Sequence, residues 1–133
     1  MKSILQSVAA VIAGCLAIAT TSFAANFAIG RIVPDFFVPG VSLSNSVVLV
    51  LILAYSIAFS GLGGYVTAWL AARSPMSHVI ALTIVQLAGG IVAATQAGAA
   101  LPRWFAVAVV ILPAPAILFG GALKTRRNLQ ITE

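Results

Sequence analysis

Few side chains in this sequence could do chemistry, and they do not gather into a catalytic or metal-binding pattern. The chain contains one cysteine, Cys15, one histidine, His78, and two acidic residues. A zinc site needs three or four closely placed His, Cys or carboxylate ligands, and a nucleophilic triad needs a carboxylate beside its histidine. A single thiol also excludes an internal disulfide. We therefore expect no enzyme activity, no catalytic residue and no metal site.

His78 is the one candidate for a cofactor ligand. It closes the polar turn Arg73-Ser74-Pro75-Met76-Ser77-His78 between two apolar segments. An imidazole can occupy one axial position of a haem, so a haem- or pigment-bearing subunit is one hypothesis. A hydrated or capping histidine at a helix start explains the residue as well, and we predict no cofactor. Arg73 is a candidate contact for a lipid phosphate or a partner carboxylate, although fixing topology is the ordinary role of such a cation.

Uncharged polar residues inside the apolar segments form the second group of candidates. Buried amides and hydroxyls are costly in a bilayer unless they are hydrogen-bonded. They either line a polar path or form hydrogen bonds between helices, and for Gln86 we expect a partner on a neighbouring helix. These residues are Tyr65, Thr67, Thr83, Gln86 and Thr95.

The composition places the chain in a membrane. Of its 133 residues, 62% are hydrophobic and only 7% are charged, whereas a soluble domain carries roughly 25% charged residues. The mean hydropathy is +1.15. The net charge of +5 comes from residues at segment ends, without the basic face or aromatic platform that nucleic-acid binding requires. The lipid bilayer is therefore the first expected partner, and nucleic acid is not one.

Four apolar segments of spanning length follow one another, at about residues 3–29, 46–72, 77–98 and 104–123. They predict an all-α integral membrane protein, a single domain over 1–133: a four-transmembrane-helix antiparallel bundle built from two helical hairpins. Residues 30–45 contain breakers such as Pro34 and Pro39, and Arg31 is close enough in sequence to pair with Asp35. Pro113 and Pro115 predict a kink in the last segment. Residues 128–133 are expected to form a solvated tail.

The first segment permits other interpretations besides a retained helix. Lys2, the apolar run and Ser22-Phe23-Ala24 resemble a secretory signal. Ile12-Ala13-Gly14-Cys15 resembles a lipobox in which Cys15 would be lipidated. Because the apolar run is long for a signal, we expect a retained span.

Small residues recur at four-residue spacing on several segments, for example at Ser56, Ser60, Gly64, Ala68 and Ala72. A ridge without side-chain bulk lets two helix backbones approach closely. The candidate helix-packing residues are Ser60, Gly64, Ala68, Gly89, Gly90, Ala93, Gly120 and Gly121.

Basic residues near the segment ends predict the orientation. With both termini on one side, that side holds Lys2, Arg73, Lys124, Arg126 and Arg127, and the other side holds Arg31 and Arg103. The positive-inside rule then puts both termini of a multi-pass membrane protein in the cytoplasm.

The second half of the chain resembles a widespread group of small, uncharacterised four-helix bacterial membrane proteins. The resemblance covers about residues 61–127, and Arg103 between Pro102 and Trp104 departs from the pattern. It implies a fold and an inner-membrane location, and no mechanism. The matching residues are Gly63, Gly64, Tyr65, Val66, Arg73, Pro75, His78, Pro102, Trp104, Pro113, Pro115, Gly120 and Gly121.

Three functional hypotheses follow from these observations. The first is a structural or accessory subunit of a larger membrane complex, or a homo-oligomer, without catalysis. The second is a small channel or transporter for a neutral solute, because no ionisable residue lies in the middle of a span to carry protons. The third is the haem- or pigment-bearing subunit that would use His78.

Overall fold

The computed structural model describes residues 2–34, 46–71 and 73–131. Within these ranges the chain forms five α-helices and the short 3₁₀-helix η2. In chain order they are α1 (Lys2–Ile32), α2 (Ser46–Leu70), α3 (Pro75–Ala97), η2 (Gly98–Ala100), α4 (Arg103–Ile111) and α5 (Pro113–Ile131). The expected all-α four-helix bundle is confirmed, because α4 and α5 follow each other as one span.

The helix ends follow the breakers in the sequence, with shifts from the predicted bounds. Helix α1 continues through Gly30, past residue 29 where we expected the first segment to end, and ends at Ile32, just before Pro34. A residue that precedes proline is disfavoured in helical geometry, so Pro34 is the effective stop. Helix α3 begins at Pro75 rather than near Ser77, because proline suits the first helical position. The predicted Arg31–Asp35 pair involves a residue outside the described ranges.

The prolines of the last span divide it into two helices. Leu112 lies in a turn between α4 and α5, and its N–H still bonds to Ala108 O at 2.9 Å. Pro113 has no N–H with which to continue the ladder, so the expected interruption occurs here. The predicted tail is wrong over its described part, since α5 continues to Ile131. Lys, Arg, Leu and Gln are good helix formers, and no proline or glycine follows Gly121.

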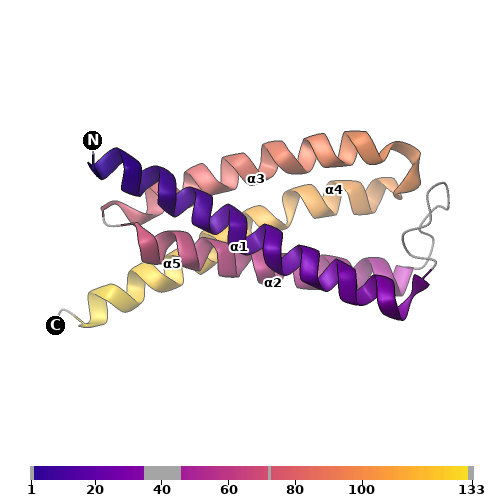
Figure 1. Cartoon of the computed structure of the whole chain (residues 1–133), viewed down its shortest axis with the longest axis horizontal. Helices are drawn as coiled ribbons and strands as arrows, with labels where there is room; N and C mark the ends of the chain where they lie inside the picture. The colour runs from indigo at the N-terminus through magenta and orange to yellow at the C-terminus, as the bar shows by residue number, and fades with distance from the viewer. Residues whose placement is uncertain (1, 35–45, 72, 132–133) are drawn as a thin grey trace.

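The helices lie antiparallel in chain order, and the two ends of the chain lie at the same end of the bundle (Figure 1). Helix α2 is the centre of the packing. Its most extensive contacts are with α5 and then with α1, while α1 makes no contact with α4 or α5 in the described ranges. The largest interface therefore joins two helices that are not neighbours in sequence.

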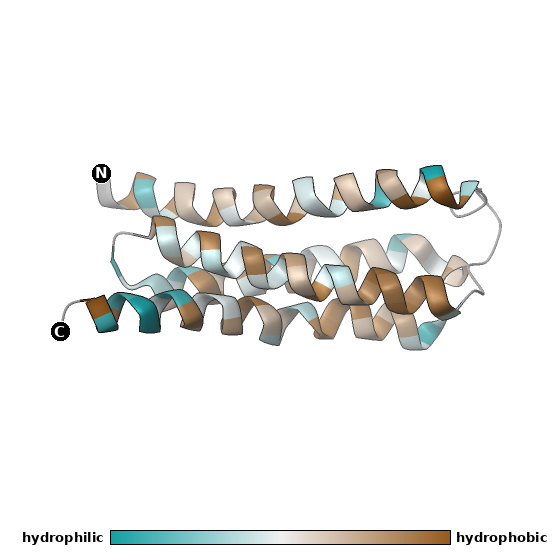
Figure 2. Cartoon of the chain, turned by 90° about the horizontal axis from the view of Figure 1, so that it is seen from below, coloured by the Kyte–Doolittle hydropathy of each residue, from teal (hydrophilic) through white to brown (hydrophobic). Residues whose placement is uncertain are grey.

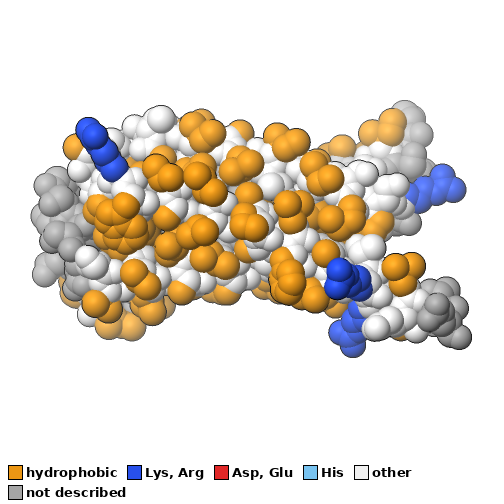
Figure 3. Space-filling model, turned by 180° about the vertical axis from the view of Figure 1, so that it is seen from behind, with side chains coloured by type: hydrophobic (Ala, Val, Ile, Leu, Met, Phe, Trp, Pro, Cys, Tyr) orange, Lys and Arg blue, Asp and Glu red, His pale blue; other side chains and the backbone are white. Residues whose placement is uncertain are grey.

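The outer surface is that of a multi-pass membrane protein. Four helices of the described chain are long and apolar enough to cross a bilayer, namely Ile4–Ile32, Ser46–Leu70, Pro75–Ala100 and the combined span Arg103–Ile131. Hydrophobic residues are found along the length of these helices, and the most hydrophilic stretch is the C-terminal part of α5 (Figure 2). On the face shown in Figure 3, hydrophobic side chains cover the middle and the Lys and Arg side chains lie towards the two ends.

Small residues bring two pairs of helices into close contact. A Cβ on Gly64 would clash with the backbone of Ile117, and one on Gly120 would clash with the backbone of Gly61. These two positions join α2 to α5. On another face of α2, the Thr67 hydroxyl lies so close to Gly14 of α1 that a Cβ on Gly14 would clash with it. This contact joins α2 to α1. Around these contacts lies a small core of Ile18, Ala68, Val79, Leu82 and Ile117.

Candidate functional site

A crevice of about 470 Å³ opens among the helices in the half of the bundle away from the chain termini. It is lined by α1, α2, α3 and α4 together with Leu101. Gln86, at the middle of α3, is the polar residue that this helix contributes to the lining. Five uncharged polar side chains contribute to the lining: Ser22, Asn26, Tyr55, Ser56 and Gln86.

The crevice exists because two kinds of packing are missing there. In the described ranges the backbones of α1 and α4 make no close contact, so the second half of α1 is not packed directly against the α4 backbone. The wall on α3 is also made of small residues, Gly89, Gly90, Ala93 and Ala94. A Cβ placed on Gly89 would meet nothing within 4 Å. Helix α3 therefore presents bare backbone to an open volume instead of a packed partner.

One hydrogen bond links two helices across the crevice. The Tyr55 hydroxyl of α2 donates to the Asn26 side-chain oxygen of α1. The side chains of Ser22, Ser56 and Gln86 make no hydrogen bond with any residue that the structure describes. The partner on another helix that we expected for Gln86 is therefore not found. Its amide faces the crevice instead.

The threonines also differ from expectation. Thr83 donates to Val79 O at 2.8 Å and Thr95 to Val92 O at 2.8 Å, both within α3. Threonine hydroxyls reach the carbonyl three or four residues earlier, so a partner on another helix is unnecessary. Thr67 is fully buried against α1, and its hydroxyl has no partner among the described residues. The prediction that these residues hydrogen-bond between helices is wrong for all three.

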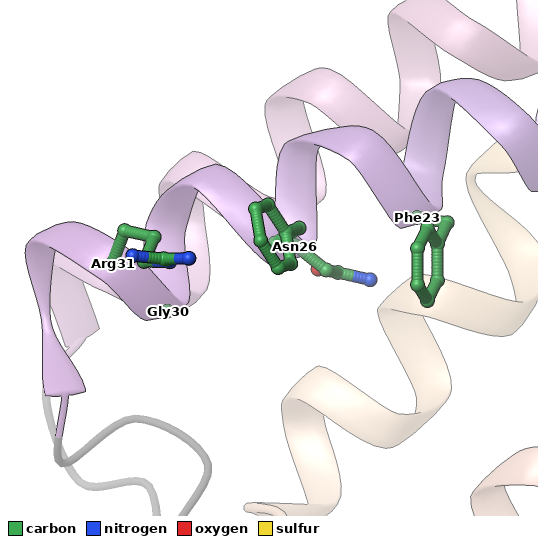
Figure 4. Close-up of a pocket in the computed structure, with 5 residues that line it drawn as sticks. Phe23, Asn26, Gly30 and Arg31 are labelled. Atoms are coloured by element: carbon green, nitrogen blue, oxygen red, sulfur yellow. The ribbon is translucent and has the colours of Figure 1, made fainter.

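The last three turns of α1 line a further hollow next to the crevice. Phe23, Asn26, Phe27, Gly30 and Arg31 line a neighbouring hollow of about 440 Å³, which shares Asn26 with the crevice. Figure 4 shows the Asn26 amide extended away from the α1 ribbon, with its nitrogen at the tip. The Arg31 guanidinium lies over the Phe27 ring, 5.1 Å from its centroid. The positive charge on α1 is thus held near the helix end, a turn or more beyond Asn26.

The remaining polar candidates lie apart from the crevice. Arg73 is exposed in the turn between α2 and α3. The His78 Nδ1 lies 3.0 Å from Ser74 O, one turn earlier. Tyr65 lies near Lys124, whose ammonium is 5.9 Å from the ring centroid. Among the described residues no group of three or more His, Cys, Asp or Glu side chains forms a metal site.

The predicted helix-packing residues fall into two sets. Gly64 and Gly120 are buried at the contact of α2 with α5, Gly121 is packed against Val79, and Ser60 and Ala68 are buried on α2. Gly89, Gly90 and Ala93 line the crevice. A Cβ added to Gly90 would lie 3.5 Å from Val110, whereas one added to Gly89 would meet nothing within 4 Å. The same spacing thus forms a helix contact in one place and an open wall in another.

Another concavity, of about 680 Å³, runs along the outside of the contact between α2 and α5. We call it the α2–α5 groove. Small residues such as Ala58, Gly61, Ala116 and Gly120 contribute to its lining, together with larger ones including Leu62, Phe119 and Leu123. It is almost entirely apolar, in contrast to the crevice.

Sequence reasoning missed Asn26, Tyr55 and Ser22 as crevice residues. The available signal was the same as for Gln86, a polar side chain inside an apolar span, and Ser22 and Asn26 are four residues apart on one helix face. Comparison with protein-family models, with curated proteins and with solved structures finds no match to the chain. The family resemblance of the second half therefore stays a prediction.

Proposed function

We propose that this protein is a structural or accessory subunit of a membrane assembly, formed with a larger complex or with copies of itself, and that it catalyses no reaction. The observation that carries the proposal is the α2–α5 groove. It is apolar, about 680 Å³ in volume, and lined in part by glycine and alanine. Lipid tails are as apolar as leucine, so helices associate in a bilayer chiefly through close packing at small residues. A transmembrane helix seated on Ala58 and Ala116 would gain that packing.

The proposed location is the bacterial inner membrane, as the family resemblance implies, with both termini in the cytoplasm. The five-to-two distribution of basic residues supports this orientation. The arrangement of the helices is compatible with it, because the first turn of α1 and the last turn of α5 lie at the same end (Figure 1).

Replacement of Ala58 by Leu tests the groove. The side chain of Ala58 is exposed, so leucine fills the groove without entering the core. Ala88→Leu is the matched control, because Ala88 is equally exposed on α3 and lies outside the groove. The proteins are extracted gently from native membranes, and particle mass and co-purifying proteins are measured. We expect Ala58→Leu to weaken the affinity for the associated material at least about tenfold, which corresponds to a loss of about 1.4 kcal/mol in binding. Ala88→Leu retains it.

A wild-type protein that is extracted as a monomer without a stoichiometric partner contradicts the proposal. Solute flux through liposomes containing the purified protein alone would favour the channel or transporter hypothesis instead. A Soret band in the absorption spectrum of the purified protein would favour the haem hypothesis.

A further inference from the structure

The polar side chains of the crevice are not satisfied by one another. The Gln86 amide carries two N–H donors and an oxygen acceptor, and no described residue bonds to any of them. Gln86 lies halfway along a membrane-spanning helix, where an unsatisfied amide is costly. The structure therefore keeps free hydrogen-bonding groups at a depth where a ligand would bind more strongly than at the surface.

The Tyr55–Asn26 bond defines what this ligand must offer. The tyrosine hydroxyl donates to the Asn26 oxygen, so the amide nitrogen is left with two N–H groups for another acceptor. In Figure 4 that nitrogen is the tip of the side chain and points away from α1. Gln86 supplies further donors from α3. The amide N–H donors of Asn26 on α1 and Gln86 on α3 could both bind a ligand that carries hydrogen-bond acceptors, such as carbonyl oxygens.

The rest of the lining is apolar and open at the side. Ile52, Val109 and the buried ring of Phe105 contact the same space. The crevice is open to the outside, and no close backbone contact joins α1 to α4 in the described part of the chain. A molecule dissolved in the bilayer can enter there with its apolar part still in lipid. No described side chain in the lining carries a charge, and burying a charged headgroup without a partner is strongly unfavourable.

We propose that the crevice is a binding site for an uncharged amphiphile, whose carbonyl oxygens accept hydrogen bonds from Asn26 and Gln86 and whose apolar tail extends into the bilayer between α1 and α4. The volume of about 470 Å³ lies within the roughly 300–1,000 Å³ range of ligand pockets. The site is separate from the α2–α5 groove, which lies on other faces of α2 and on α5.

Photo-crosslinking with a neutral diacyl lipid tests the site. The protein is placed in phosphatidylcholine nanodiscs with 1,2-dioctanoylglycerol that carries a diazirine in one chain, and labelled residues are mapped by mass spectrometry. Labels are expected on crevice residues such as Ile52, Ala93 and Phe105. Unlabelled dioctanoylglycerol competes, and dioctanoyl phosphatidic acid, which has the same chains and a charged head, competes at least about tenfold more weakly because its charge must be desolvated.

Near-isosteric variants separate hydrogen bonding from general lipid contact. Asn26→Leu and Gln86→Leu each lower crevice labelling about fivefold, the value of one typical hydrogen bond. Gln96→Leu is the control, since Gln96 is exposed near the end of α3 and outside the crevice. Ala93→Phe, which blocks the space and removes no hydrogen bond, abolishes labelling. Circular dichroism and size-exclusion elution volume identify any variant that fails to fold. If a leucine variant fails to fold, the test uses Ala93→Phe, whose position is exposed and therefore tolerates a larger side chain.

Labelling spread over the outer surfaces of all helices and unchanged by Gln86→Leu and Ala93→Phe overturns the proposal, as does equal competition by phosphatidic acid. The outcome is independent of the accessory role. A monomeric protein that still shows selective labelling contradicts the accessory role alone. Loss of selectivity in a protein that keeps its partners contradicts the crevice site alone.

Discussion

At the scale of single residues, the role of a glycine in this bundle is decided by what stands opposite it. Gly64 and Gly120 face backbone atoms of α5 and α2, so no methyl group fits at either position. Gly89 faces open space. All three belong to glycine pairs and to apolar helices, and nothing in their local sequence distinguishes them. The distinction depends on which helix is the neighbour.

Alanine substitution measures this difference. Gly64→Ala and Gly120→Ala each push two backbones apart, and we expect each to lower the unfolding free energy by about 1–3 kcal/mol, as overpacking typically does. Gly89→Ala meets no atom and is expected to leave stability unchanged or to raise it by up to about 1 kcal/mol through helix propensity. Unfolding in mixed micelles by titration with sodium dodecyl sulfate gives these values. Equal effects at Gly64 and Gly89 would show that the close contact of α2 with α5 is absent.

At the scale of elements, the last span is shaped by the proline that divides it. Pro113 is buried at the start of α5 and lacks the N–H that would bond to Val109. The change of direction at Leu112 lets α4 pack along α3 while α5 crosses α2 (Figure 1). A continuous straight helix could not pack along α3 in its first part and cross α2 in its second part at the same angles.

Replacing Pro113 by Ala restores the donor, so we expect the span to straighten. Spin labels at positions 103 and 129, in a protein with Cys15 replaced by Ala, report the end-to-end distance. A straight helix places these positions about 39 Å apart at 1.5 Å per residue. We expect a shorter distance in the protein with Pro113 and a shift towards the straight value in Pro113→Ala. The control is Pro115→Ala, which leaves the break at Leu112 in place. Identical distances in all three proteins would contradict this role of Pro113.

The elements were the most predictable part of the molecule, because each depends on local sequence. Apolar runs of spanning length gave the four spans, and Pro34, Pro75 and Pro113 lie at their ends or breaks. The continuation of α1 past Gly30 was missed because one glycine does not outweigh the helix formed by its neighbours. The crevice was not predictable as a site. Its prediction would require the tertiary packing, in which α1 packs against α2 without a close backbone contact to α4 in the described ranges. It would also require the hydrogen bond between Asn26 and Tyr55, which are 29 residues apart in the sequence.

At the scale of the whole molecule, the positions of the charges give a test of orientation. Arg31 and Arg103 belong to one end of the bundle, and Arg73 and Lys124 to the other, with the chain ends (Figure 1). We expect single cysteines at 31 and 103, in a protein lacking Cys15, to react with a membrane-impermeant maleimide in intact cells. Cysteines at 73 and 124 react only after the membrane is opened, because the side richer in Lys and Arg is cytoplasmic. Labelling of positions 31 and 73 from the same side would contradict the antiparallel arrangement.

The dominance of the contact between α2 and α5 has a consequence for biogenesis. The ribosome finishes α2 at Leu70, but the helix that covers its glycine face is complete only at Ile131. At roughly 5–20 residues per second, the delay is about 3–12 seconds. During that interval nascent α2 has α1 as its early neighbour, while its glycine-lined face waits in lipid or against the insertion machinery. A truncated product that stops before α5 keeps this face uncovered, which makes it a natural substrate for membrane proteases.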